Sequence, residues 1–179
     1  MAWTSPITFV ANTPLTAQQL NENLRDNFMV SEVAIASEPQ GLIFATDLNT
    51  LVERVGSSDI IDTSETTTST SYVDLDTVGP TVTVTTGTRA LLLFSCQFQS
   101  DTTGCTMLMS IDISGNTTIA AADTGALQLD GILEDKTNRM SLCNFVDELT
   151  PGENTFTAKY RTSGPNGTFS DRNLTVIPF

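Results

Sequence analysis

Apolar and polar residues alternate through most of the chain after residue 71, and this pattern limits the fold more than any other feature. Threonine alternates with valine in segment 81–85, and segments 107–113 and 155–161 alternate in a similar way. A two-residue period places successive side chains on opposite faces of a β-strand, so that one face can be buried. Segment 90–98 is apolar almost throughout, which is typical of a central strand.

Turn-forming residues separate these segments, at Ser114-Gly115-Asn116, in the stretch 149–154 and at Gly164-Pro165-Asn166-Gly167. Roughly eight strands with turns about every 8–15 residues are typical of an all-β domain. The pattern predicts a mainly β fold, an antiparallel β-sandwich of jelly-roll-like topology. It does not define the strand order.

The first part of the chain has a different pattern. Residues 1–13 are expected to form an irregular arm, and Thr16 with Gln19 matches a capping box at the start of a helix. Apolar residues then recur at helical spacing as far as about Ala36, namely Leu20, Leu24, Phe28 and Ile35. The apolar stripe of this predicted helix could pack on the chain's own sandwich. It could instead pack against other copies or a partner protein.

A second short helix is expected over residues 47–55, because apolar residues recur there at helical spacing and Gly56 follows. Residues 59–71 are rich in Ser and Thr and are expected to be a linker, although Ile60 and Ile61 could form a short strand. The expected organisation is an N-terminal docking and oligomerisation region of short helices (1–58), the linker (59–71) and the β-sandwich (72–179).

Charge and hydropathy exclude several classes of partner. The net charge is −13 and no basic run is present, which argues against binding to nucleic acid or to anionic membrane surfaces. No apolar run is long enough for a membrane-spanning helix, and no signal peptide is apparent at the N-terminus. We therefore expect the chain to fold in the cytoplasm where it is made.

Histidine, on which many catalytic and metal sites depend, is absent from the chain. This absence excludes Ser–His and Cys–His nucleophiles and histidine-based metal sites. A carboxylate-only glycosidase pair is the remaining enzymatic alternative. Calcium binding through loop residues Asp101, Asp123 and Asp130 is a further alternative, although their spacing does not match a calcium-binding loop. We expect no catalytic residue, no cofactor and no bound metal.

The three cysteines, Cys96, Cys105 and Cys143, lie in apolar strand patterns without a CxxC spacing. Buried free thiols are therefore expected, and a zinc site is not. A Cys96–Cys105 disulfide across a hairpin is the alternative.

Several segments resemble those of small virion structural proteins of tailed bacteriophages. The first combines Trp3, residues 15–21 (Leu-Thr-Ala-Gln-Gln-Leu-Asn) and residues 24–27 (Leu-Arg-Asp-Asn). Residues 41–51 are similar to a second segment of phage fibre-type proteins, and parts of 63–84 and 149–179 resemble their C-terminal β domain. The resemblance implies attachment to the particle by the N-terminus. It also implies a homo-oligomer, with a trimer favoured, next to other virion proteins such as major capsid or tail proteins.

The expected function is therefore that of a structural protein located in the virion, and head decoration or a short head fibre is favoured over a tail component. The chain lacks a long coiled coil or β-repeat, which argues against a long fibre. The expected docking residues are Trp3, Ile7, Phe9, Leu20, Leu24 and Phe28. The alternative is a tail-associated module that binds a host-surface glycan or protein, with contacts from Tyr72, Tyr160, Arg161 and Phe169.

Overall fold

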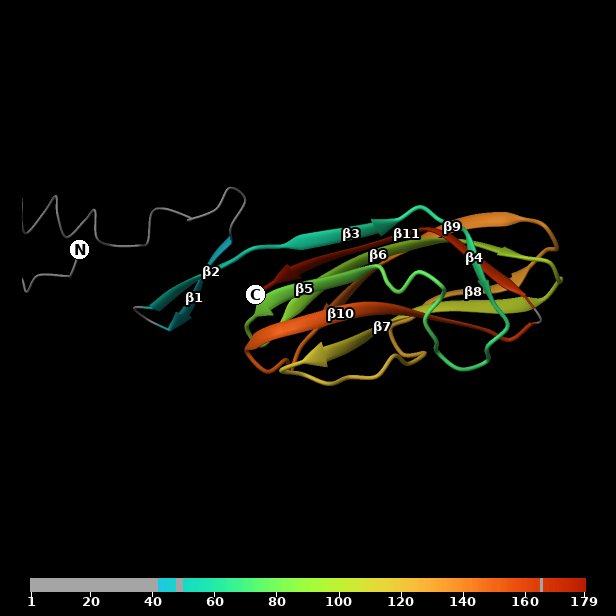
Figure 1. Cartoon of the computed structure of the whole chain (residues 1–179). Coiled ribbons are helices and arrows are strands. Elements are labelled where there is room, and N and C mark those ends of the chain that lie inside the picture. The colour runs from blue at the N-terminus through green and yellow to red at the C-terminus, as the bar shows by residue number, and fades with distance from the viewer. Residues whose placement is uncertain (1–41, 48–49, 165) are drawn as a thin grey trace, which may run out of the picture. The chain divides into compact units, whose positions relative to one another are not determined.

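The computed structural model describes residues 42–47, 50–164 and 166–179. Within these ranges the regular secondary structure consists of β-strands alone (Figure 1). The chain divides into two units, residues 1–53 and 54–179. β1 (Leu42–Asp47) and β2 (Thr50–Arg54) form a separate two-stranded sheet. The helix expected from residue 16 lies outside the described residues, as do all the expected docking residues, Trp3, Ile7, Phe9, Leu20, Leu24 and Phe28.

The prediction of a helix over residues 47–55 is wrong, because this segment contains β2 and the end of β1. A helix of this length is marginal by itself, whereas β2 gains backbone hydrogen bonds by pairing with β1. The β1 residues Ile43 and Phe44 also favour strands over helices. Pairing with the preceding segment therefore overrides the helical spacing of the leucines and valines.

Residues 54–179 form two antiparallel sheets. Their strands are β3 (Ser57–Ile61), β4 (Glu65–Thr67), β5 (Thr81–Thr86), β6 (Ala90–Ser100), β7 (Cys105–Gly115), β8 (Leu127–Ile132), β9 (Thr137–Val146), β10 (Gly152–Thr162) and β11 (Gly167–Pro178). One sheet has the order β5-β10-β7-β8 and is called the β10 sheet. The other has the order β3-β11-β6-β9 and is called the β11 sheet, in which β4 also pairs with β11. The two sheets form the two layers of a sandwich (Figure 1).

The strand order is that of a jelly roll. With β4 set aside, the first strand pairs with the last (β3 with β11), and the nested pairs β5–β10, β6–β9 and β7–β8 follow. This arrangement folds one long antiparallel ribbon into two facing sheets, which leaves few exposed strand edges. The predicted antiparallel β-sandwich is therefore confirmed, and the structure supplies the strand order.

Residues 59–71, expected to be a linker, are part of the sandwich. β3 pairs with residues 172–176 of β11, and β4 pairs with residues 167–169. Farther along, Val73 and Tyr160 exchange two backbone hydrogen bonds, and the N–H of Thr162 donates to the carbonyl of Ser69. The long strands β10 and β11 have backbone groups that need partners along their whole length, and this polar segment provides them. Of the two interpretations of Ile60 and Ile61, the short strand is correct.

Aromatic rings fill the centre of the sandwich. Phe98, Phe169 and Tyr160 are completely buried, and the Phe169 ring centroid lies 5.6 Å from that of Phe98 and 4.9 Å from that of Tyr160. The Tyr160 hydroxyl donates a 2.8 Å hydrogen bond to the carbonyl of Gly79, which satisfies the one polar group of this cluster.

A β-bulge in β11 turns an arginine into the core. Asp171 and Arg172 together stand opposite one residue of β6, and Asp171 has a positive φ of 47°. The extra residue reverses the alternation, so that Phe169 and Leu174 both face inward although they are five positions apart. Arg172 consequently has no exposed surface.

The buried guanidinium of Arg172 is held by an acid and by threonine oxygens. Its Nη2 lies 3.3 Å from Oε2 of Glu65 and donates to Oγ1 of Thr63 at 3.0 Å, and its Cζ lies 5.5 Å from the Tyr160 ring centroid. Burial raises the pKa of Glu65. Hydrogen bonds from Thr77 and Thr63 and the charge of Arg172 lower this pKa by more, so that the net shift is downward. This network ties β4 and the chain near Thr77 to the bulge in β11.

Candidate functional site

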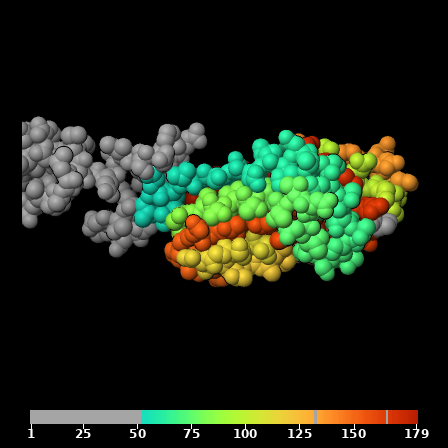
Figure 2. All heavy atoms as spheres, in the orientation of Figure 1, coloured from blue at the N-terminus to red at the C-terminus, as the bar shows by residue number. Residues whose placement is uncertain are grey.

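Each sheet turns one face to the core and the other outward, and the two outer faces differ in chemistry. The outer face of the β10 sheet is called the threonine face because Thr81, Thr83 and Thr85 of β5 lie beside Thr155 and Thr157 of β10. β5 and β10 run side by side at the molecular surface (Figure 2). The same face carries the charged residues Asp112, Glu153, Lys159 and Arg161.

Loop residues cover part of the threonine face. Ser110 of β7 donates a 2.7 Å hydrogen bond to the carbonyl of Ala122 and accepts one from its N–H at 3.2 Å. The segment around Ala122 therefore lies over the outer side of β7. Leu108, on the same face of β7 as Ser110, has no exposed surface.

A cluster of three side chains joins this loop to the segment before β5. The Tyr72 hydroxyl and Nε of Arg161 each donate to Oδ1 of Asp123 at 3.0 Å, and Nη2 of Arg161 donates to Oδ2 at 2.6 Å. The Arg161 hydrogen bonds hold the pKa of Asp123 below its ordinary value, while burial and the contact with Asp123 raise the pKa of Tyr72 to about 12. Both carboxylate oxygens are engaged within the cluster, which therefore fastens two segments across β10.

The structure separates the four residues expected to contact a receptor. Tyr72 and Arg161 meet in the cluster just described, whereas Tyr160 and Phe169 are core residues without exposed surface and are not available to a receptor in this fold. The alternation within β10 could have shown this, because Tyr160 lies two and four positions after Ala158 and Phe156 and therefore shares their buried face.

The outer face of the β11 sheet is here called the neutral face. Alternation and register place on it Ser58 and Ile60 of β3, Asn173, Thr175 and Ile177 of β11, Leu91, Leu93, Ser95, Gln97 and Gln99 of β6, and Thr137, Arg139, Ser141, Cys143 and Phe145 of β9. None of these is acidic. Asp171 at the bulge is the one carboxylate beside them in the described part of the sheet, and it lies 3.7 Å from Arg139.

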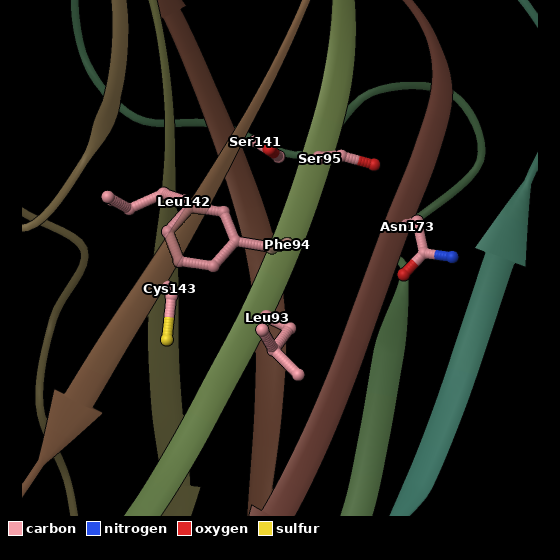
Figure 3. Close-up of a pocket in the computed structure, with 7 residues that line it drawn as sticks. All are labelled: Leu93, Phe94, Ser95, Ser141, Leu142, Cys143 and Asn173. Atoms are coloured by element: carbon pink, nitrogen blue, oxygen red, sulfur yellow. The ribbon is translucent and has the colours of Figure 1, made fainter.

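One end of the neutral face is apolar. Leu91 pairs with both Ile177 and Phe145, and the Phe145 side chain, 51% exposed, lies 5.9 Å between ring centroids from Phe179. The guanidinium of Arg89 lies 6.0 Å from the Phe145 ring centroid. Toward the middle of the face is a shallow hollow of about 280 Å³ lined by Leu93, Phe94, Ser95, Ser141, Leu142, Cys143 and Asn173 (Figure 3).

The cysteines match the expectation in part. All three are free, so the alternative of a Cys96–Cys105 disulfide is wrong. Cys96 and Cys105 are buried as expected, and burial raises the pKa of the Cys96 thiol to about 12. Cys143 is exposed, contrary to the expectation, because β9 is the last strand of its sheet and Cys143 is on the outer face.

Within the described ranges, the Cys, Asp and Glu side chains form no group of three or more that could hold a metal ion. In the same ranges, no helix has the length and apolar character needed to cross a membrane.

Comparisons with known proteins identify a shared fold. No protein-family model matches the chain, and no curated protein is similar to it in sequence. Among solved structures, the chain is similar to that of infectious bursal disease virus strain Gx, with a TM-score of 0.51 and 14% identity over 74% of this chain. It is similar to the VP2 subviral particle of the same virus with a TM-score of 0.50 and 14% identity, again over 74%. The chain spans about a third of those proteins (35% and 36%), and at this identity the likeness is one of fold.

Proposed function

We propose that this chain is a structural virion protein without enzymatic activity. In this proposal it belongs to a tailed bacteriophage and decorates the head or forms a short head fibre. The part of residues 1–58 that precedes β3 docks on the particle, and the jelly roll projects from it. The observation that carries the proposal is the jelly-roll strand order, a fold that the VP2 particle protein shares, in a chain whose N-terminal segment resembles those of phage virion proteins.

The position of the sandwich in the chain supports separate roles for the docking region and the sandwich. The described residues from 54 onward form a sandwich with its own aromatic core, so a docking region ahead of it can be changed without opening that core. Many identical sites on a particle allow modest contacts by each copy to add up through multivalency.

The experiment compares particles assembled with the full chain and with a chain lacking residues 1–30. We expect the truncated chain to be absent from purified particles while its circular dichroism remains that of a β-sandwich. Leu24→Glu should reduce incorporation in the same way, whereas Gln18→Glu, on the other side of the predicted helix, should not. Incorporation of the truncated chain at the level of the full chain would refute docking by this region.

The Tyr72–Arg161–Asp123 cluster favours a second candidate, a tail-associated receptor-binding module. Its aromatic ring, guanidinium and carboxylate lie on a polar face, where they could contact a sugar or protein. This candidate predicts that the full chain binds host cells and blocks adsorption, and that Tyr72→Ala abolishes both effects. If the chain decorates phage heads but does not bind host cells, the receptor-binding candidate is rejected and the head-decoration proposal stands.

A further inference from the structure

We infer that the neutral face is the surface through which copies of this chain contact one another, so that it lies buried at the axis of a homo-oligomer. The occupant of the face is the neutral face of another copy. The inference deepens the proposed function, because it names the oligomer contact that a projecting virion protein would use. It rests on charge, area and surface chemistry within residues 54–179.

Charge selects a second copy as the partner. The chain carries a net charge of −13, so two copies repel each other at most approaches. The neutral face has no acidic side chain along its four strands except Asp171, which is paired with Arg139. On the threonine face, in contrast, Lys159 and Arg161 are already paired with Asp74 and Asp123, which leaves the charges of Asp112 and Glu153 in excess. Contact through the neutral face therefore brings copies together where their mutual repulsion is smallest.

The area of the face is sufficient for a stable contact. The four strands have 5, 12, 11 and 10 residues, rise ~3.3 Å per residue and lie about 4.8 Å apart, which gives a face of ~600 Å². A specific interface of standard size buries about 800 Å² on each partner. The flat face alone thus provides most of that area before side-chain relief is counted.

The chemistry of the face is that of an interface. Apolar side chains at one end, Leu91, Leu93, Phe145 and Ile177, give way to amides and hydroxyls such as Asn173, Gln97 and Ser141. Leu93 is 39% exposed and Phe145 is 51% exposed, and both lie on the outer side of strands whose inner side already packs in the sandwich. Contiguous apolar surface on an otherwise polar molecule marks an interaction site.

The test measures the mass of the full chain in solution together with the reactivity of Cys143. Cys96 and Cys105 are buried in the core, so Cys143 reports on the neutral face alone. We expect the wild-type chain to be an oligomer by light scattering and its Cys143 to be protected from a thiol reagent. Leu93→Glu should yield a monomer in which Cys143 reacts at least about tenfold faster. Thr83→Glu, a matched charge on the threonine face, should leave the mass and the protection unchanged.

Salt separates this partner from one of opposite charge. Screening weakens the repulsion between acidic copies, so oligomerisation should strengthen as NaCl is raised, whereas binding to a basic protein should weaken. A monomeric wild-type chain would overturn the inference, and so would an oligomer in which Cys143 reacts freely. If the oligomer has a freely reactive Cys143 and the chain lacking residues 1–30 is absent from particles, the neutral face is not the oligomer contact. The docking proposal then remains intact.

Discussion

Replacing Glu65 by glutamine should destabilise the sandwich more than replacing its buried partner Arg172 by methionine. The Glu65→Gln change preserves shape but leaves the guanidinium of Arg172, which has no exposed surface, without a counter-charge. Breaking a buried ion pair by removal of one partner costs about 3–5 kcal/mol. The Glu65 side chain is 12% exposed, so water can compensate in part, and we expect a loss of about 3 kcal/mol.

The Arg172→Met change removes the buried charge itself. Methionine can pack on the Tyr160 ring, and Glu65 keeps its hydrogen bonds from Thr63 and from the N–H and hydroxyl of Thr77. The Glu65 carboxylate that remains reaches water and keeps these hydrogen bonds, so its charge stays compensated and we expect a loss of about 1 kcal/mol. The double variant should resemble Arg172→Met, because no unpaired charge remains in the core.

Urea unfolding at pH 7, followed by far-ultraviolet circular dichroism, measures these differences. A loss of about 3 kcal/mol corresponds to roughly 10 °C in Tm for a domain of this size. The reasoning is refuted if Glu65→Gln costs no more than Arg172→Met, or if the double variant is less stable than Glu65→Gln alone. Either result would mean that the charge of Glu65 contributes nothing to holding Arg172 in the core.

The same pair predicts a pH dependence. The pKa of Glu65 is lower in the folded chain than its ordinary value of 4.5. The ionised carboxylate therefore stabilises the fold above about pH 4.5, and this contribution disappears as the pH falls through the lowered pKa. The stability difference between wild type and Glu65→Gln should accordingly shrink below pH 4.5, whereas a difference that grows on acidification would contradict the assignment.

Three further predictions concern single residues. Asn154→Ala should cost about 2–3 kcal/mol in urea unfolding, because the buried amide oxygen accepts a 2.7 Å hydrogen bond from the N–H of Thr117 that nothing then replaces. Asp123→Asn should lower the pKa of Tyr72 from about 12 in an ultraviolet titration, since the carboxylate disfavours the phenolate, and an unchanged value would contradict the contact. Cys96 should resist alkylation in the native chain and react only after denaturation, because burial raises its pKa to about 12.

Local patterns were reliable where one side of a strand is buried. The Thr–Val alternation of segment 81–85 matches β5, and the alternation of segment 155–161 matches the inner and outer faces of β10. The same patterns failed for residues 47–55, where helical spacing coexists with strand-forming residues, and for residues 59–71, whose polar composition concealed β3 and β4. In both cases, backbone hydrogen bonds to another strand stabilise a strand that the local sequence does not predict.

The candidate surfaces were less accessible to sequence reasoning. The Tyr72–Arg161–Asp123 cluster joins residues that are far apart in the sequence, with 89 positions between Tyr72 and Arg161. Only the packing of two segments over β10 brings them together. Cys143 and Phe145 lie in a strand with apolar residues on both faces, so the alternation does not say which face is outward. The register with β6 decides this, because Cys143 stands opposite the exposed Leu93 and Leu142 opposite the buried Phe94.

The amino-acid sequence by itself determined that most of this chain forms antiparallel strands, because the alternation and the turn residues are local properties of the backbone and side chains. Only the tertiary structure decided that β3 pairs with β11 and that Arg172 turns inward, since these depend on contacts between residues more than 100 positions apart and on a bulge of one residue. The absence of acids from the neutral face is written in the sequence. It becomes visible only when four strands that are far apart in residues 54–179 are placed side by side.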